Sequence, residues 1–172
     1  MTSNLIAALV CAPAVAIALA APAHAQGVLS THRLSAALAA EAASEAVAAC
    51  AKQGYGVSAT VIDTAGERQA MVRGDGATQI AVLTSYDKAY TVMMLGSIRN
   101  EDSSGAIAQR IGNNQPAGGL VKVPHILLQP GAFRIKLGGE AIAAIGVGGA
   151  PGGNLDEGCA KAGIDKISDR LK

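Results

Sequence analysis

Residues 138–163, GGEAIAAIGVGGAPGGNLDEGCAKAG, constrain the fold of this chain more than any other stretch. An apolar run at 141–147 gives way to glycines within 148–153, and a helical pattern then begins at Asn154. A strand that is apolar at every position is typical of one covered on both faces of its sheet. The stretch therefore predicts a buried strand that enters a helix through a glycine-rich loop. Because backbone N–H groups at a helix start can hold an anion, Gly148 and Gly149 are candidate ligand-binding residues.

The N-terminus has the pattern of a secretory signal peptide. Residues 1–25 contain no Lys, Arg, Asp or Glu, are apolar from Leu5 to Ala21, and end in Ala23-His24-Ala25. Small residues at the first and third positions before a cleavage site suit signal peptidase. We therefore expect a periplasmic or secreted protein with one domain, residues 26–172, and no stable membrane insertion after cleavage. An uncleaved anchor is the alternative, although the run is short and rich in alanine for a span.

Charge and aromatic content narrow the class of ligand. The net charge of +1 gives no support for nucleic-acid binding, which needs a strongly basic face. The chain has no Trp and one Phe, so it lacks an aromatic platform for stacking bases or sugars. A flat hydrophobic ligand would have to be held by aliphatic side chains and backbone.

The two cysteines of the mature chain, Cys50 and Cys159, each fall in a predicted helix. Two thiols in an oxidising compartment can pair, but nothing in the sequence indicates that these helices touch. A metal site has no support, since there is no Cys-x-x-Cys and the histidines lack ligand spacing.

Periodicity along the chain predicts eight elements. Helical patterns occupy 31–54, 77–96, a short stretch after Asp102, and 154–171, while alternating or β-branched patterns occupy 57–63, 68–72, 133–137 and 141–147. Short turns at 64–67 and 138–140 predict two hairpins. The order α-β-β-α-α-β-β-α indicates an α+β fold with an antiparallel sheet and helices on both faces.

Candidate binding residues lie in the second helix and in the irregular segment that follows the third. Asp87 and Lys88 are adjacent, so they cannot pair with each other and must find other partners or water. Lys88 is either a partner for an acidic ligand group or part of a solvated patch. Tyr86 and Tyr90 share a helix face and either flank a ligand or pack in the core.

His125 precedes the aliphatic run 126–128 in a segment whose prolines exclude a long helix. It is either an axial ligand of haem iron or a loop histidine hydrogen-bonded to backbone. No Gly-x-Ser-x-Gly motif, His-x-x-x-His motif or phosphate-binding loop supports an enzyme mechanism.

Taken together, three groups of motifs resemble the GlcG/HbpS-like haem-binding family, which also includes the C-terminal domain of some PduO corrinoid adenosyltransferases. They are VIDTAG at 61–66 with RGDGA at 73–77, DKA at 87–89, and AIGVGGAP at 144–151 followed by DEGCA at 156–160 and Ala162-Gly163. The resemblance covers residues 30–172.

The resemblance implies a three-layer α/β/α, profilin-like domain with a five-stranded antiparallel sheet, its fifth strand supplied by 126–128, and assembly into homo-oligomers. It further implies binding of haem or a similar tetrapyrrole, with His125, and His32 near the first helix, as candidate iron ligands. The family's Gly-Gly-Val-Pro-Ile segment is Pro-Gly-Ala-Phe-Arg-Ile at 130–135 here. Phe133 and Arg134 thus replace a Val-Pro pair in a loop expected to border the pocket.

The sequence and the resemblance together predict an exported, oligomeric haem- or tetrapyrrole-binding protein without intrinsic catalysis, serving binding, sensing or storage. Two alternatives stay open. One is an accessory protein or enzyme acting on a small oxidised metabolite. The other is an oligomeric structural or interaction module without haem.

Overall fold

The computed structural model describes residue 27 and residues 29–114 and 118–171. The chain divides into two units, 1–31 and 32–172. The expected signal peptide, 1–25, lies outside the described residues, and the described residues before His32 have no regular secondary structure. No helix among the described residues is both long and apolar enough to cross a membrane.

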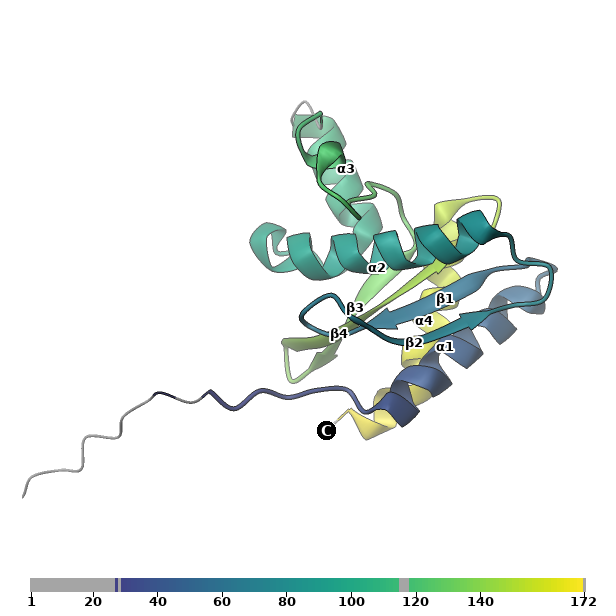
Figure 1. Ribbon diagram of the computed structural model, residues 1–172, viewed down its shortest axis with the longest axis horizontal. Coiled ribbons are helices and arrows are strands. Elements are labelled where there is room, and N and C mark those ends of the chain that lie inside the picture. Colours follow the sequence, from purple (N-terminus) through teal and green to yellow (C-terminus); the bar gives the residue numbers. More distant parts are fainter. Residues whose placement is uncertain (1–26, 28, 115–117, 172) are drawn as a thin grey trace, which may run out of the picture. The chain divides into compact units, whose positions relative to one another are not determined.

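A four-stranded antiparallel sheet forms the centre of the second unit (Figure 1). Its strands are β1 (Ser58–Ile62), β2 (Arg68–Arg73), β3 (Ala132–Leu137) and β4 (Glu140–Gly148), in the order β2-β1-β4-β3. The two predicted hairpins, β1-β2 and β3-β4, are confirmed. They join through the central pair β1 and β4, in which Ser58 lies opposite Gly148. Every residue of β1 is buried, as expected for a strand with both faces covered.

Helices cover both faces of the sheet. The helices are α1 (Ala36–Ala51), α2 (Gln79–Arg99), α3 (Ser104–Asn114) and α4 (Gly153–Ile167), with single 3-10 turns at Leu120–Lys122 and Ser168–Arg170. Figure 1 shows α2 on one face and α1 with α4 on the other. Two apolar cores result, one between the sheet and α1 with α4, and the other between the sheet and α2.

Small residues let the layers approach closely. Gly146 and Gly148 of β4 lie under α2, where an added Cβ would come within 2.2 Å of the Ser85 carbonyl oxygen or 2.3 Å of Thr84 Oγ1. The buried face of α1 consists of alanines and Cys50. At Gly163 of α4, a Cβ would lie 2.4 Å from the Ala42 carbonyl oxygen of α1. The close contacts at Gly146 and Gly148 hold α2 above the glycine-rich end of β4, where the candidate site forms.

The fifth strand expected at 126–128 is not present, because these residues have no regular structure. Their backbone groups bond outside the sheet instead: Ile126 N–H donates to the Val123 carbonyl at 3.2 Å, and Leu127 N–H donates to Thr91 Oγ1 of α2 at 2.7 Å. The first helix also begins later than expected. Ser35 caps it by accepting from Leu38 N–H, while Leu34 is buried in the core.

Cys50 and Cys159 form a disulfide with a Cα–Cα distance of 5.6 Å. This bond joins α1 to α4, the contact that the sequence could not establish.

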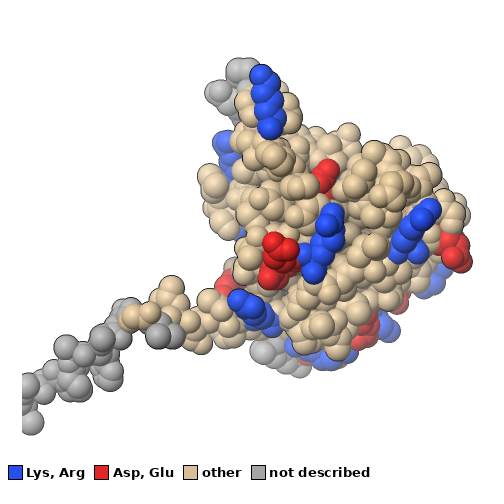
Figure 2. All heavy atoms as spheres, viewed as in Figure 1, with Lys and Arg blue, Asp and Glu red and all other residues tan. Residues whose placement is uncertain are grey.

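Basic and acidic side chains are interspersed over the face of the molecule that is drawn in Figure 2.

Candidate functional site

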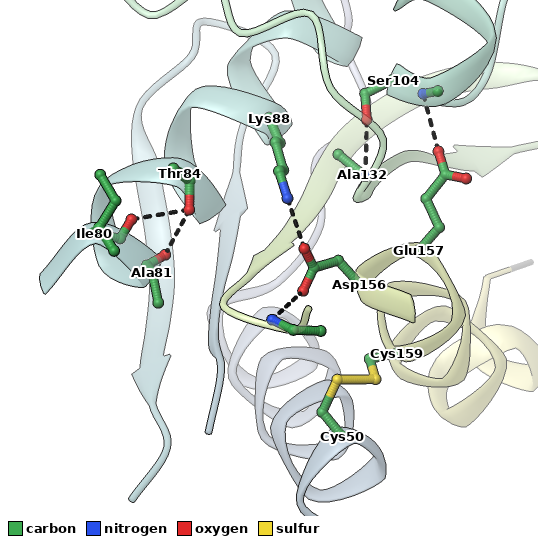
Figure 3. Close-up of polar contacts among 12 residues, drawn as sticks. Cys50, Ile80, Ala81, Thr84, Lys88, Ser104, Ala132, Asp156, Glu157 and Cys159 are labelled. Atoms are coloured by element: carbon green, nitrogen blue, oxygen red, sulfur yellow. Dashed lines mark hydrogen bonds and ion pairs between the residues drawn. A yellow bond between two sulfur atoms is a disulfide. The ribbon is translucent and has the colours of Figure 1, made fainter. Parts of the chain in front are cut away.

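A buried ion pair links α2 to the first turn of α4 (Figure 3). Lys88 Nζ lies 2.7 Å from Asp156 Oδ2, and only 4% of the Lys88 side chain and 2% of the Asp156 side chain are exposed. The other carboxylate oxygen, Oδ1, accepts the Ala150 N–H of the glycine-rich loop at 3.0 Å. Burial raises the pKa of Asp156, and the hydrogen bond and positive charge of Lys88 oppose that rise. The ion pair therefore connects α2, α4 and the glycine-rich loop.

A cavity of about 340 Å³ opens beside this ion pair. Its polar lining comes from Thr84 and Lys88 of α2, Asp156 of α4 and Gln129. The remaining lining is the loop wall, made of Pro130, Gly149, Ala150, Pro151, Gly152 and Gly153. The glycine-rich loop and the start of the helix predicted within 138–163 thus form one wall of a cavity.

The position of Lys88 follows from the pattern of α2. The buried residues of α2 include Ala81, Ser85 and Val92, which lie seven and three positions before Lys88 and four positions after it. These are helical spacings, so Lys88 shares their inward face. Gly131, with φ at +139°, passes so close that an added Cβ would lie 2.8 Å from Lys88 Nζ. The lysine is therefore not part of a solvated patch.

A second group of polar and aromatic side chains surrounds His125. Its Nδ1 lies 2.9 Å from Asp87 Oδ1, and its ring meets the rings of Tyr86 and Tyr90 at centroid distances of 4.9 and 5.5 Å. The Arg68 guanidinium lies 3.7 Å from the centre of the Tyr86 ring, and the Tyr86 hydroxyl donates to the Gly66 carbonyl. Burial raises the pKa of Tyr86, against the positive charge of Arg68.

His125 has a left-handed backbone conformation, φ +66°, which is uncommon for a residue with a Cβ. Such conformations persist where surrounding contacts hold them, and they concentrate at functional sites. Here the contacts come from α2, through Asp87 and through Thr91 Oγ1, which lies 3.3 Å from the His125 carbonyl oxygen. With Nδ1 directed at a carboxylate, Nε2 is the ring nitrogen left for a ligand, and half of the side chain is exposed.

The ion pair and the histidine group lie on different faces of α2. Successive helix residues are rotated by about 100°, so Lys88 points about 200° away from both Tyr86 and Tyr90. Two of the predicted site residues, Lys88 and Gly149, come together at the cavity, and Gly148, the last residue of β4, directly precedes Gly149. Tyr90 and His125 come together at the histidine group. Asp87 and Lys88 find separate partners, as predicted.

The other three predicted site residues lie outside both groups. Phe133 is on β3, half-buried against the core beneath α1 and α4. Arg134 donates through Nε to Asp102 Oδ1 at 2.9 Å and through a terminal nitrogen to Ser97 Oγ. His32 Nδ1 lies 2.8 Å from Glu140 Oε2, and 65% of its side chain is exposed. Within the described residues, no three His, Cys, Asp or Glu side chains cluster so as to hold a metal ion.

Sequence reasoning missed Asp156, Thr84 and Gln129 at the cavity and the role of Asp87 at the histidine group. The sequence pattern indicates Asp156 only as a dipole-favoured acid at the start of a helix. The spacing of Ala81, Ser85 and Val92 was a usable signal that Lys88 faces inward, and a buried lysine needs an acid. The partner, 68 residues away, could not be read from the sequence.

An antiparallel sheet with helices on both faces, carrying a glycine-rich strand-to-helix loop over a buried ion pair, defines a small α+β class of domain. The family model described as haem degrading protein HbpS-like matches residues 34–165. The chain therefore belongs to the HbpS-like family, which confirms the resemblance seen in the sequence.

Solved structures agree with this assignment. A structure of a double mutant of Streptomyces reticuli HbpS is 30% identical, covers 93% of this chain and 97% of its own, and has a TM-score of 0.73. A second HbpS structure is 32% identical over 81% of this chain and 93% of its own, also with a TM-score of 0.73. A PduOC complex with haem, 17% identical over 79% and 96% of the two chains with a TM-score of 0.68, shares the fold. Among curated protein sequences there is no match.

Proposed function

We propose that this protein is an exported, oligomeric haem- or tetrapyrrole-binding protein without intrinsic catalysis, in which His125 ligates the iron. The observation that carries the proposal is the pairing of His125 Nδ1 with Asp87, which leaves Nε2 as the donor atom. A carboxylate on the far nitrogen fixes the tautomer and raises the basicity of a ligating imidazole. The haem named in the PduOC structure and the HbpS-like family description support the same ligand.

The residues around His125 fit a tetrapyrrole. Tyr86 and Tyr90 offer aromatic surface beside the imidazole, and Arg68 places a positive charge beside Tyr86, where it suits a propionate. Bound haem would supply an iron centre for which imidazole nitrogen is an established ligand. The protein's own part is to hold the imidazole, through Asp87 and the backbone contacts of Thr91.

Hemin titration of the mature protein, followed by the Soret band, tests this proposal. We expect saturable binding by the wild type and a loss of affinity of at least tenfold in His125→Ala. Asp87→Asn should lose about tenfold, because it removes the group that orients the imidazole. His32→Ala is a matched control, since His32 also has Nδ1 on a carboxylate but lies outside the tyrosine group around His125. A wild type without a saturable shift, or equal binding by both alanine variants, would refute the assignment.

Export is supported by the pattern of residues 1–25 and by the disulfide, since disulfides persist in oxidising compartments. The intact mass of protein recovered from the periplasm or medium tests it. We expect a chain that starts at Gln26 and is two mass units lighter than its reduced form. Full-length reduced protein confined to the cytoplasm would contradict export.

Self-association is supported by one face of α2. Ile80 and Ile98 are 63% and 75% exposed, and their separation of 18 positions is five full helical turns, so they share a face. Leu83, which is 46% exposed, lies next to this face of α2. Sedimentation should show an oligomer that Ile80→Lys with Ile98→Lys dissociates, while Val121→Lys, at another exposed apolar position, leaves it intact. A monomeric wild type would overturn this part of the proposal.

A further inference from the structure

We propose that the cavity beside Lys88 and Asp156 binds a short aliphatic carboxylate, with the acid group toward Lys88 and the start of α4 and the carbon chain against the proline wall. The site is separate from the haem site proposed around His125. It does not depend on haem binding.

The first argument is the number of donors on Lys88. An ammonium group has three N–H donors, and among the described residues only Asp156 accepts from it. The side chain is 4% exposed and lines the cavity, so the missing acceptors have to come from what occupies the cavity, either water or a ligand. Because unsatisfied buried donors are costly, an acceptor inside the cavity is expected, and a carboxylate supplies two oxygens.

The second argument is the electrostatic balance of the cavity. Asp156 cancels the charge of Lys88, and both of its oxygens already accept protein hydrogens, from Lys88 and from Ala150. The start of α4 adds a partial positive charge, and Gly152 supplies no side-chain cap for its first N–H groups. A single negative charge suits this balance better than the double charge of phosphate.

The third argument is the size and lining of the cavity. About 340 Å³ lies at the low end of the range for small-molecule sites, which suits an acid of a few carbons rather than a macrocycle. Pro130, Ala150 and Pro151 give it an apolar wall. Gly153 cannot be enlarged without moving this wall, because a Cβ there would lie 2.5 Å from the Pro130 carbonyl oxygen.

The same carboxylate chemistry is present in the propionate arms of haem. Lys88, however, points about 200° around α2 from the tyrosines that contact His125. One haem ligated by His125 is therefore not expected to reach Lys88, and we assign the cavity to a free acid.

Amide NMR of the wild-type protein, titrated with sodium propionate at constant ionic strength, tests the assignment. We expect saturable shifts in the millimolar range at residues 149 and 152–154. Neutral propionamide and inorganic phosphate should give at least tenfold weaker effects at these amides. No saturation there, or equal binding by phosphate or propionamide, would overturn the proposal.

Two further experiments distinguish propionate binding in the cavity from other causes of the amide shifts. Lys88→Gln should weaken propionate at least tenfold, whereas Lys166→Gln, which removes an exposed charge from α4, should not. If Lys88→Gln does not fold, the wild-type comparison of propionate with propionamide decides. Saturating propionate should leave hemin binding unchanged, and competition between the two would reassign the cavity to a haem propionate. Loss of hemin binding in His125→Ala with propionate shifts intact would support two independent sites.

Discussion

Lys88 and Asp156 show how a single buried contact can organise three segments of the chain. Each ion loses its hydration on burial, and only the mutual attraction and the Ala150 N–H offset that loss. Burial raises the pKa of Asp156 even with Lys88 beside it, so ionisation of the carboxylate destabilises the folded state, and does so more once Lys88 is removed. The contribution of the ion pair to stability is therefore measured by removing one of its two members.

Lys88→Met should lower the free energy of unfolding at pH 7 by about 3–5 kcal/mol, because it leaves a buried carboxylate without its counter-ion. A folded-state pKa above the unfolded value gives stability that is present at low pH and lost as pH rises through the folded pKa. Part of the loss should therefore be regained on acidification to pH 5, where Asp156 is protonated more easily. Urea unfolding at both pH values measures this.

The double variant Lys88→Met with Asp156→Leu is the control, since removing both ions should restore most of the stability. A loss in Lys88→Met below about 1 kcal/mol, equal at both pH values, would mean that the pair is not tightly buried.

At the scale of elements, the strands and helices followed their sequence patterns closely, and the departures have local physical causes. All four strands expected from alternation formed, because their apolar faces and turn residues agree on one register. The fifth strand at 126–128 was expected only from the family resemblance, since the sequence pattern there is irregular. The backbone groups of this segment are instead satisfied by Thr91 and Val123, and Thr91 gave no sign of this in the sequence.

Thr91→Val should destabilise the protein by about 1–3 kcal/mol, because Leu127 N–H would lose its acceptor in a partly buried contact. Hemin affinity should fall as well, since the His125 backbone is held by the same hydroxyl. Thr84→Val is the matched control, because the Thr84 hydroxyl bonds within its own helix, to the Ile80 carbonyl. Its unfolding free energy should change by about 0.5 kcal/mol or less.

Arg134 was expected to border a ligand pocket and instead helps hold the α2–α3 connection against β3. Asp102 in that connection accepts from Arg134 and from Lys136 Nζ, the latter at 2.9 Å. Burial acts to raise the pKa of Asp102, but the two cations outweigh it and hold the pKa below its ordinary value. A lowered pKa of this kind stabilises the fold above the ordinary pKa and is lost as pH falls through the folded value.

Asp102→Asn should therefore be less stable than the wild type at pH 7, by a small amount because Asp102 is half exposed. The difference should begin to shrink as the pH falls through the ordinary carboxyl pKa of about 4, and it should vanish only below the lower pKa that Asp102 has in the folded protein. Thermal unfolding of both proteins between pH 3 and 7 checks this, and Asp165→Asn at an exposed i,i+4 pair is the control. A difference that grows on acidification would show the opposite sign of linkage.

At the scale of the whole molecule, family and layer order could be predicted, but the pairing of distant side chains could not. Patterns at 61–66, 87–89 and 144–160 were sufficient for the family, since each reflects local backbone needs. The Cys50–Cys159 bond and the Lys88–Asp156 pair depend on how α1 and α2 each meet α4 in space. Local periodicity carries no information on contacts between helices that are distant in sequence. It predicts only that both cysteines lie in helices.

Removing the disulfide, with Cys50→Ala and Cys159→Ala, should lower the free energy of unfolding by about 2–5 kcal/mol, because the bond closes a loop with a sequence separation of 109 residues. Guanidinium unfolding of the double variant against the oxidised wild type measures the change. Reductant should shift the wild-type midpoint toward that of the variant and leave the variant unmoved. Free thiols in the native exported protein would contradict the bond.

The placement of this bond also has a consequence for biogenesis. Cys50 precedes the first strand and Cys159 follows the last, so every strand must be synthesised and delivered before the two sulfurs can meet. In the mature chain we propose, Cys11 has left with residues 1–25, and the two remaining cysteines have one intramolecular arrangement available. Such a chain needs an oxidant to mature but no isomerase to correct it.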